Sequence, residues 1–310
     1  MSASRLRAMT TGDRSEVAEL IYASINTWYR NHGLSEIFRG GPEVTEIFYD
    51  TYNAIEPGCC VVAENTRTGR LMGSCFYHPR ERHVALGIMN VHPNYFGCGV
   101  GKALLQYICD YTDRTGYRSL RLTQSALNLD SFSLYNRAGF VPRHAYQDMM
   151  ISVPGDGLGK TPPGIDRCRD ARLEDVDAIK QLEDAISGVT REQDYRFIIE
   201  NQSRFWHASV YEEPDGRVTG FLASSGHQAL NMLGPGFART EEQSAALVFR
   251  ELDQYRGGTP IVVVPAERDK LVHTLYGWGA RNCELHFCQV RGEFQPFRGL
   301  NFPTFILETA

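Results

Sequence analysis

The stretch VHPNYFGCGVGKALL, residues 91–105, has a glycine at every second position from 97 to 101 and then continues into a helical pattern. The glycines connect a strand to a helix that begins near Lys102. A helix N-terminus has unpaired N–H groups and a partial positive charge, and glycine lets a ligand come close to the backbone. One or two glycines would fit a tight turn, whereas three alternating glycines favour a phosphate-binding loop.

Two common nucleotide-binding motifs do not fit this loop. A P-loop would need glycine at position 96 and Ser or Thr at position 103, where the chain has Phe96 and Ala103. A dinucleotide fingerprint starting at Gly97 would need glycine at position 102, which is Lys102.

The loop resembles the acyl-CoA pyrophosphate loop of the GCN5-related N-acetyltransferases (the GNAT family), whose pattern is V-x-P-x-x-[QR]-x-x-G-x-[GA]. The matching residues are Val91, Pro93, Gly99 and Gly101. Residues 128–140, NLDSFSLYNRAGF, are similar to a second motif of that family, N-x-x-A-x-x-L-Y-x-x-x-G-F. The aligned residues are Asn128, Leu134, Tyr135, Gly139 and Phe140, with Ser131 in place of the usual alanine. The resemblance extends over about residues 4 to 153.

The resemblance implies acetyl-CoA as co-substrate. No metal is expected, because the cysteines lack the spacing of metal ligands. The resemblance also implies that backbone amides of the glycine loop hold the pyrophosphate, and that the strand before the loop pairs with the pantetheine arm. The amide of Met89 or Val91 is then expected to polarise the thioester carbonyl. The residues expected to contact acetyl-CoA are Met89, Asn90, Val91, Phe96, Gly97, Cys98, Gly99, Val100, Gly101, Lys102, Asn128 and Ser131.

Phe96 departs from the family pattern, which has Arg or Gln at this position. Phenylalanine cannot donate a hydrogen bond to a phosphate, so we expect a loss of about 1 kcal/mol of binding free energy. Phe96 is either a tolerated loss or a packing anchor.

Acetyl transfer to an amine requires a deprotonated amine, a polarised carbonyl and a proton for the departing thiolate. The resemblance assigns the general acid to Tyr135, whose alternative role is that of a buried aromatic. For the base, His92 is the catalytic candidate, and an ordered water chain is an equal alternative. The other nearby candidates are His83, Glu81 and Tyr77.

The acceptor is expected to be a small-molecule or peptide amine. Trp28 and Tyr29 could form an apolar wall of its site, or could equally pack in the core. A protein that binds or senses acyl-CoA without turnover is the alternative function, favoured by Phe96 and by the absence of a clear base.

The chain has two halves with the same outline. The Pro- and Gly-rich residues 154–164 read as a linker between a catalytic domain, 1–153, and a second domain, 165–310. GRLMG at 69–73 is echoed by GRVTG at 216–220. The expected fold class is α/β of the α+β type: two tandem GNAT-like domains, each a mixed, mostly antiparallel sheet flanked by helices.

The second half is expected to be a degenerate copy. Its loop LGPGFARTEEQ, 233–243, has two glycines, but Glu241 and Glu242 begin the next helix and would repel a pyrophosphate. Leu275 stands where the spacing to Gly279 would place the catalytic tyrosine.

Composition fits a globular protein, with 42% apolar and 22% charged residues. A net charge of -5 argues against nucleic-acid binding, and the sequence shows neither a signal peptide nor a membrane-spanning run. The 8 cysteines lack a CxxC pair, so we expect reduced thiols in a cytoplasmic protein. The oligomeric state stays open.

Overall fold

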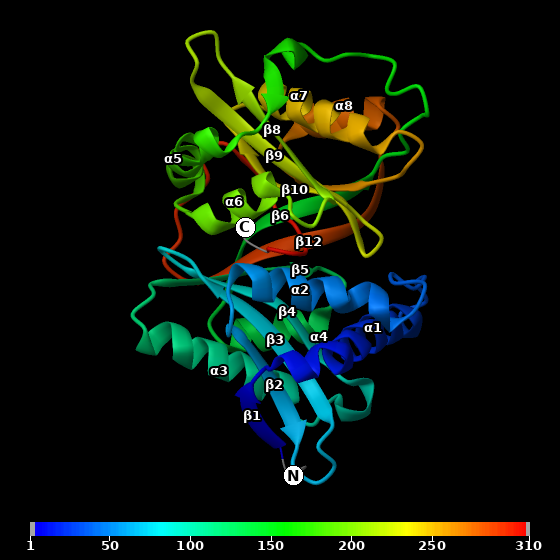
Figure 1. Ribbon diagram of the computed structural model, residues 1–310, viewed down its shortest axis with the longest axis vertical. Helices are drawn as coiled ribbons and strands as arrows, with labels where there is room; N and C mark the ends of the chain where they lie inside the picture. The colour runs from blue at the N-terminus through cyan, green and yellow to red at the C-terminus, as the bar shows by residue number, and fades with distance from the viewer. Residues whose placement is uncertain (1–3, 308–310) are drawn as a thin grey trace. The chain divides into compact units, whose positions relative to one another are not determined.

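The computed structural model of the protein describes residues 4–307. These residues form two compact units (Figure 1). The first unit contains the chain up to Pro79 together with Val84–Leu120, and the second contains Arg80–His83 and the chain from Arg121 onward. Each unit is described by itself below.

The first unit is an antiparallel sheet with helices on both faces. Its strands, in order across the sheet, are β1 (Ser4–Ala8), β2 (Cys60–Asn65), β3 (Leu71–Pro79) and β4 (Val84–Val91). Its α-helices are α1 (Arg14–Asn31), α2 (Glu46–Ile55) and α3 (Val100–Arg114), and short 3-10 turns are η1 (Thr11–Asp13), η2 (Pro42–Thr45) and η3 (Pro93–Tyr95).

Alternate residues of β3 show which helices cover which face. Tyr77 packs against Tyr111 of α3, with ring centroids 4.9 Å apart. The preceding residue, Phe76, stacks at 4.5 Å on Tyr52 of α2. Successive side chains of a strand point to opposite faces, so α3 covers one face of the sheet and α2 the other.

The second unit contains a larger sheet. Its strands are β6 (Val141–Met150), β7 (Cys168–Asp170), β8 (Trp206–Glu212), β9 (Val218–His227), β10 (Leu230–Ala238), β11 (Ile261–Pro265), β12 (Arg281–Gly292) and β13 (Leu300–Phe302). Their order is β12-β6-β11-β10-β9-β8-β7, with β13 paired to β10. The helices are α4 (Leu129–Arg137), α5 (Val176–Ser187), α6 (Glu192–Glu200), α7 (Glu241–Leu252) and α8 (Asp269–Gly277), with short turns η4 (Ile165–Arg167), η5 (Leu173–Asp175) and η6 (Asp253–Tyr255). Strand β5 (Ser119–Ser125) begins in the first unit and continues into the second.

The β-strands of this sheet are paired antiparallel except for β10 and β11, which are parallel. Sheets flanked by helices therefore occur in both units, antiparallel in the first and mixed but mostly antiparallel in the second.

Strand β6 precedes the 154–164 segment in the sequence, but it lies in the sheet formed by strands that follow this segment. It pairs with β11 on one side, where Ile261 lies opposite Met150, and with β12 on the other, where Arg281 lies opposite the same residue. The compact units therefore divide the chain near residue 120, whereas the sequence pattern repeats after the 154–164 segment. The domain boundary proposed from the sequence, at residue 153, follows the repeat of the sequence pattern. Strand β6 lies before this boundary, but its partners β11 and β12 lie after it.

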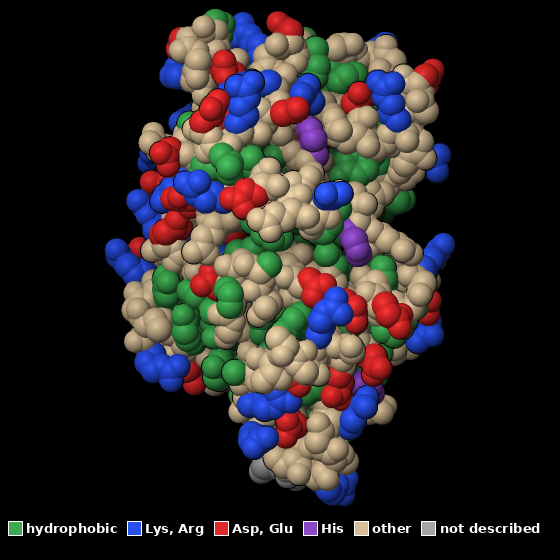
Figure 2. Space-filling model, viewed as in Figure 1, with side chains coloured by type: hydrophobic (Ala, Val, Ile, Leu, Met, Phe, Trp, Pro, Cys, Tyr) green, Lys and Arg blue, Asp and Glu red, His purple; other side chains and the backbone are tan. Residues whose placement is uncertain are grey.

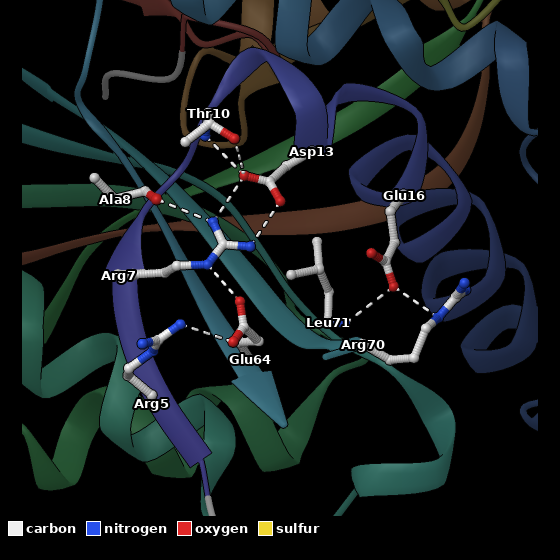
Figure 3. A network of polar contacts seen from close by, with 9 residues as sticks. All are labelled: Arg5, Arg7, Ala8, Thr10, Asp13, Glu16, Glu64, Arg70 and Leu71. Atoms are coloured by element: carbon white, nitrogen blue, oxygen red, sulfur yellow. Dashed lines mark hydrogen bonds and ion pairs between the residues drawn. The ribbon is translucent and has the colours of Figure 1, made fainter. Parts of the chain in front are cut away.

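A network of ion pairs fixes the start of α1 to the sheet (Figure 3). The Arg7 guanidinium donates to Asp13 at 2.7 and 2.8 Å and to Glu64 of β2 at 2.6 Å. Hydrogen bonding from Arg7 lowers the pKa of the Asp13 carboxyl to about 2. Nearby, Glu16 accepts from the Leu71 amide at 3.0 Å and thereby joins α1 to β3.

The second half repeats this network. Arg169 donates to Asp175 at 2.8 Å through both terminal nitrogens and to Glu212 of β8 at 2.7 Å. Asp175 also accepts from the Arg172 amide, as Asp13 does from the Thr10 amide. The same three-residue constellation at the same place in each half supports a duplicated unit.

Two glycines paired in the sequence repeat have the same packing role. A Cβ on Gly73 would lie 2.9 Å from a methyl of Val100 in α3, and one on Gly220 would lie 2.7 Å from a methyl of Leu247 in α7. A side chain at either position would push the helix off the sheet.

Among residues 4–307, no helix is both long and apolar enough to cross a bilayer. On the face drawn in Figure 2, basic and acidic side chains are interspersed.

Candidate functional site

The glycine loop follows β4 and leads through η3 into α3. Gly97 has φ of 74° and Gly99 has φ of 83°, a left-handed conformation that other residues rarely adopt. A Cβ at either position would meet nothing within 4 Å, so the backbone here faces open space. Gly101 differs, because it lies in the first turn of α3. Two of the three glycines are therefore required by backbone conformation and face a space that a ligand can fill.

Helix α3 begins without a side-chain cap. Its N-cap residue is Gly99, which has no side chain to accept a hydrogen bond, and the first backbone bond after it runs from the Ala103 amide to the Gly99 carbonyl at 3.0 Å. The amides from Gly99 to Lys102 thus precede the first helical bond. Such a terminus is a binding site for an anion, and a diphosphate fits its hydrogen-bonding capacity.

The side chains of the loop lie at the surface. Phe96 is 47% exposed, which argues against the packing-anchor role considered for it. Cys98 and Lys102 are also exposed. Phe96 therefore lies at the surface of the loop, and the loss of a polar contact to a phosphate stays a prediction.

Strand β4 has a bulge just before the loop. Between the pairs Cys75–Met89 and Tyr77–Leu86, β3 advances by two residues and β4 by three. Gly87 belongs to this bulge, and a Cβ there would lie 3.0 Å from the hydroxyl of Tyr52. A bulge interrupts strand pairing and re-aims nearby backbone groups, and bulges are frequent beside active sites.

Among the three residues that end β4, Asn90 is held in place by a neighbour. It is buried, and its Oδ1 accepts from the Ser24 hydroxyl at 2.8 Å. Its Nδ2 has no hydrogen-bond partner among the described residues. Met89 and Val91 on either side are partly buried. The bulge, Gly87 and the Ser24 contact were missed by the sequence analysis, because strand alternation alone does not reveal a bulge.

His92 has a local structural role. Its Nδ1 accepts from the Asn94 amide at 3.2 Å and so caps η3. In the neutral ring this places the proton on Nε2, which leaves no free acceptor nitrogen. The geometry argues against His92 as the base.

The second-motif residues lie on α4, in the second unit. Asn128 is the N-cap, and its Oδ1 accepts from the Ser131 amide at 3.0 Å. The Asn128 Nδ2 group is a separate donor, because capping uses only the oxygen. Tyr135 is buried on the helix, with its ring 5.7 Å from that of Phe140. Burial fits both roles considered for this tyrosine.

Two other base candidates are buried. Burial, together with the charge of Arg121, holds the pKa of His83 well below its ordinary value, and its ring nitrogens have no hydrogen-bond partner among the described residues. Burial also raises the pKa of Tyr77. A fourth candidate, Glu81, is paired with Lys180 at 3.4 Å.

Trp28 and Tyr29 are half-buried near the end of α1. Trp28 stacks on His32 with ring centroids 4.0 Å apart and meets Tyr29 edge-on at 5.1 Å. Neither aromatic is a fully buried core residue.

In the second half, the helix that corresponds to α3 is α7, and side chains of the protein itself occupy the amides at its N-terminus. The Thr240 hydroxyl accepts from the Gln243 amide at 3.2 Å, and the Gln243 side chain accepts from the Thr240 amide at 3.2 Å. Glu241 accepts from the Leu271 amide of α8 at 2.7 Å. The sequence signal for this cap is the capping-box pattern Thr-x-x-Gln at residues 240–243.

One expectation for this half is wrong. LGPGF was read as part of a loop matching the glycine loop, but Gly234 and Gly236 lie inside β10. The strand bulges between Leu233 and Gly236, and Gly236 has close neighbours on β9: a Cβ there would lie 2.4 Å from a methyl of Leu222.

Comparison with known proteins is consistent with this geometry. Residues 25–140 match the acetyltransferase (GNAT) family. A candidate acetyltransferase from Pyrococcus horikoshii superposes with a TM-score of 0.75 at 13% identity, covering 97% of this chain and 95% of that one. A tandem GNAT protein from the clavulanic acid biosynthesis pathway gives 0.61 at 12% identity, covering 94% and 98%.

Similarity to a curated protein is more limited. UPF0157 protein YqkA of Bacillus subtilis is 29% identical over 90 residues, which are 28% of this chain and 26% of that protein. The chain therefore matches about a quarter of this relative's length.

The fold is that of the GNAT acetyltransferases, present as two tandem domains. Residues 25–140 thus match the acetyltransferase (GNAT) family, whose fold supports acyl-CoA-dependent acetyl transfer in general.

Proposed function

We propose that the protein transfers an acetyl group from acetyl-CoA to a primary amine, with the glycine loop of the first half as its acyl-CoA site. The observation that carries this proposal is the uncapped start of α3, preceded by two left-handed glycines that face open space. The amides of Gly97, Gly99, Gly101 and Lys102 bind the pyrophosphate.

The bulged strand β4 provides the next part of the site. Its backbone after Gly87 pairs with the pantetheine arm, and the amide of Met89 or Val91 donates to the thioester carbonyl. The Asn128 Nδ2 group and Ser131 on α4 bind the same arm.

In the reaction, the amine nitrogen attacks the carbonyl carbon, the C–S bond breaks, and the thiolate takes a proton from the Tyr135 hydroxyl. A phenol can protonate a thiolate at the end of the reaction because the transfer is coupled to departure of the sulfur. The amine proton passes to water, since His83 and Tyr77 are buried and the Nδ1 of His92 is occupied, and water then returns a proton to the Tyr135 phenolate.

The alternative function is that of a protein that binds acyl-CoA without turnover. It is favoured by the exposed Phe96, which replaces a polar contact, and by the absence of a well-placed base among residues 4–307.

Two measurements decide between them. Titration calorimetry with acetyl-CoA on the wild type and on Gly99→Glu should show one site per chain, abolished by the carboxylate in the loop. Release of free CoA thiol, followed for a panel of small amines, amino acids and peptide N-termini, should show turnover that Gly99→Glu removes.

Binding of acetyl-CoA without turnover on every acceptor would favour the sensing function. Failure of the folded wild type to bind acetyl-CoA would overturn both functions.

A further inference from the structure

A short strand near the end of the described chain fills a gap in the sheet of the second unit. Strands β10 and β11 are parallel neighbours only where Met232 and Leu233 lie opposite Ile261 and Val262. Beyond the bulge of β10, its next segment, Gly236–Ala238, pairs instead with β13. Strand β13 also contacts β11. It therefore lies in the slot that opens where the two parallel strands separate.

Residues 299–307 form what we call the closing segment, which includes β13. Its apolar side chains belong to the core: Leu300 and Phe302 pack in the same cluster as Leu233 and Val262. The Ile306 side chain is fully buried as well.

Polar contacts fix the closing segment at both ends. At its start, Arg268 donates to the Gly299 carbonyl at 2.8 Å. At its other end, the buried Arg191 donates to the Leu307 carbonyl at 3.1 Å while also binding Glu183. A buried guanidinium with a buried carboxylate partner is costly to rearrange, so this contact is a firm anchor.

The slot and the segment fit closely. A Cβ on Gly299 would lie 2.5 Å from the Ala238 carbonyl oxygen, and one on Gly234 would lie 2.7 Å from the Pro303 carbonyl oxygen. Each glycine permits an approach that any larger residue would block, one on the segment and one on the wall of the slot. The close contact therefore depends on a glycine in the closing segment and on a glycine in β10.

Resting on the function proposed above, we infer that the closing segment occupies, in the second half, the place that corresponds to the acyl-CoA site of the first half. It occupies the slot along β10 that corresponds to the pantetheine slot along β4, and so closes this half to acyl-CoA. The slot takes an extended, hydrogen-bonding chain, and the chain that fills it is a segment of the same protein, bound by strand addition.

An independent observation agrees with this assignment. The helix that follows β10 is α7, whose first-turn amide at Gln243 is already bonded to Thr240. Glu241 adds a carboxylate at the same terminus. Both parts of the second half that correspond to an acyl-CoA site, the phosphate-binding terminus and the arm slot, are thus filled by residues of this chain.

The test uses the full chain with a recognition site for a sequence-specific protease inserted between Gly292 and Glu293, which are both exposed. After cleavage, the fragment should stay bound through gel filtration. It should then exchange, one to one, with a labelled synthetic peptide of residues 293–307. The matched control is the same peptide with Leu300→Asp and Phe302→Asp, which places charges where the core lies and should not bind.

Amide hydrogen exchange gives a second readout that needs no cleavage. In the intact protein, the amides of Gly236–Ala238 should be protected. Displacement of the fragment should speed exchange by at least about tenfold for those of these amides that face β13, whereas those that face β9 should stay protected. Rapid exchange in the intact protein, or equal binding of the two peptides, would overturn the inference.

Neither readout involves acetyl-CoA, so the inference and the proposed function can fail separately. A chain that binds no acetyl-CoA but exchanges the peptide refutes only the acetyl transfer. Two equivalents of acetyl-CoA bound per intact chain refute the closed second half.

Discussion

Replacing Gly99 by alanine separates the ligand-binding role of the glycine loop from its backbone strain. The chain offers a matched control in Gly58, which has φ of 85° against 83° for Gly99. A Cβ at either position meets nothing within 4 Å. Gly58 lies in the turn after α2, away from the glycine loop in the sequence. The two substitutions therefore impose the same strain with the same absence of clashes.

The expected magnitudes follow from these two observations. A non-glycine residue in the left-handed region costs about 1 to 2 kcal/mol, so both variants should lose about that much free energy of unfolding. Only the methyl at position 99 occupies the space in front of the α3 amides. If it removes one charge-assisted hydrogen bond to a phosphate, acetyl-CoA binding weakens by about 1.5 to 3 kcal/mol, or roughly 10- to 150-fold in Kd.

The assays are urea unfolding and titration calorimetry with acetyl-CoA on wild type, Gly58→Ala and Gly99→Ala. The stability losses should agree, while the Kd rises only for Gly99→Ala. Equal affinity in the two variants would refute the assignment of the loop as the phosphate site. A much larger stability loss at position 99 would show that the loop is packed and does not face a ligand.

Three further predictions concern other parts of the chain. Tyr135→Phe keeps the aromatic ring beside Phe140 and should lower kcat by about 100-fold or more with little change in KM for acetyl-CoA, measured by CoA release. Asp13→Asn should lower the free energy of unfolding by up to about 2 kcal/mol at pH 7; because the folded pKa is lowered to about 2, the difference from wild type in urea unfolding should shrink as the pH falls from about 4 through 2. Thr240→Ala removes the cap of α7 and should cost about 1 kcal/mol in thermal unfolding without altering acetyl-CoA affinity.

Local sequence patterns predicted much of the first half. Val17, Leu20 and Ile21 have the spacing of one face of a helix, and all three are buried on α1. The glycine loop was placed correctly between β4 and α3, because the strand end, the glycines and the helical pattern are adjacent in sequence.

Features that depend on distant residues were not predictable in this way. The bulge at Gly87 arises from pairing with β3, and the reason for the glycine is the Tyr52 ring from α2. LGPGF looks like a loop because its glycine and proline are usually turn residues, whereas packing against β9 and the pairing of β13 keep it in a strand. The residues next to a strand in the sequence do not indicate which distant strand pairs with it.

The position of β6 has a consequence for biosynthesis. This strand ends at Met150, but its two neighbours, β11 and β12, end at Pro265 and Gly292. At about 5 to 20 residues per second, a ribosome would need roughly 7 to 28 seconds after the end of β6 to complete both partner strands. Tyr146 and Met149, which are fully buried in the finished protein, are uncovered during that time. A gene cut after codon 153 would therefore encode a polypeptide with an open, apolar strand that recruits chaperones or aggregates, and not a minimal catalytic domain.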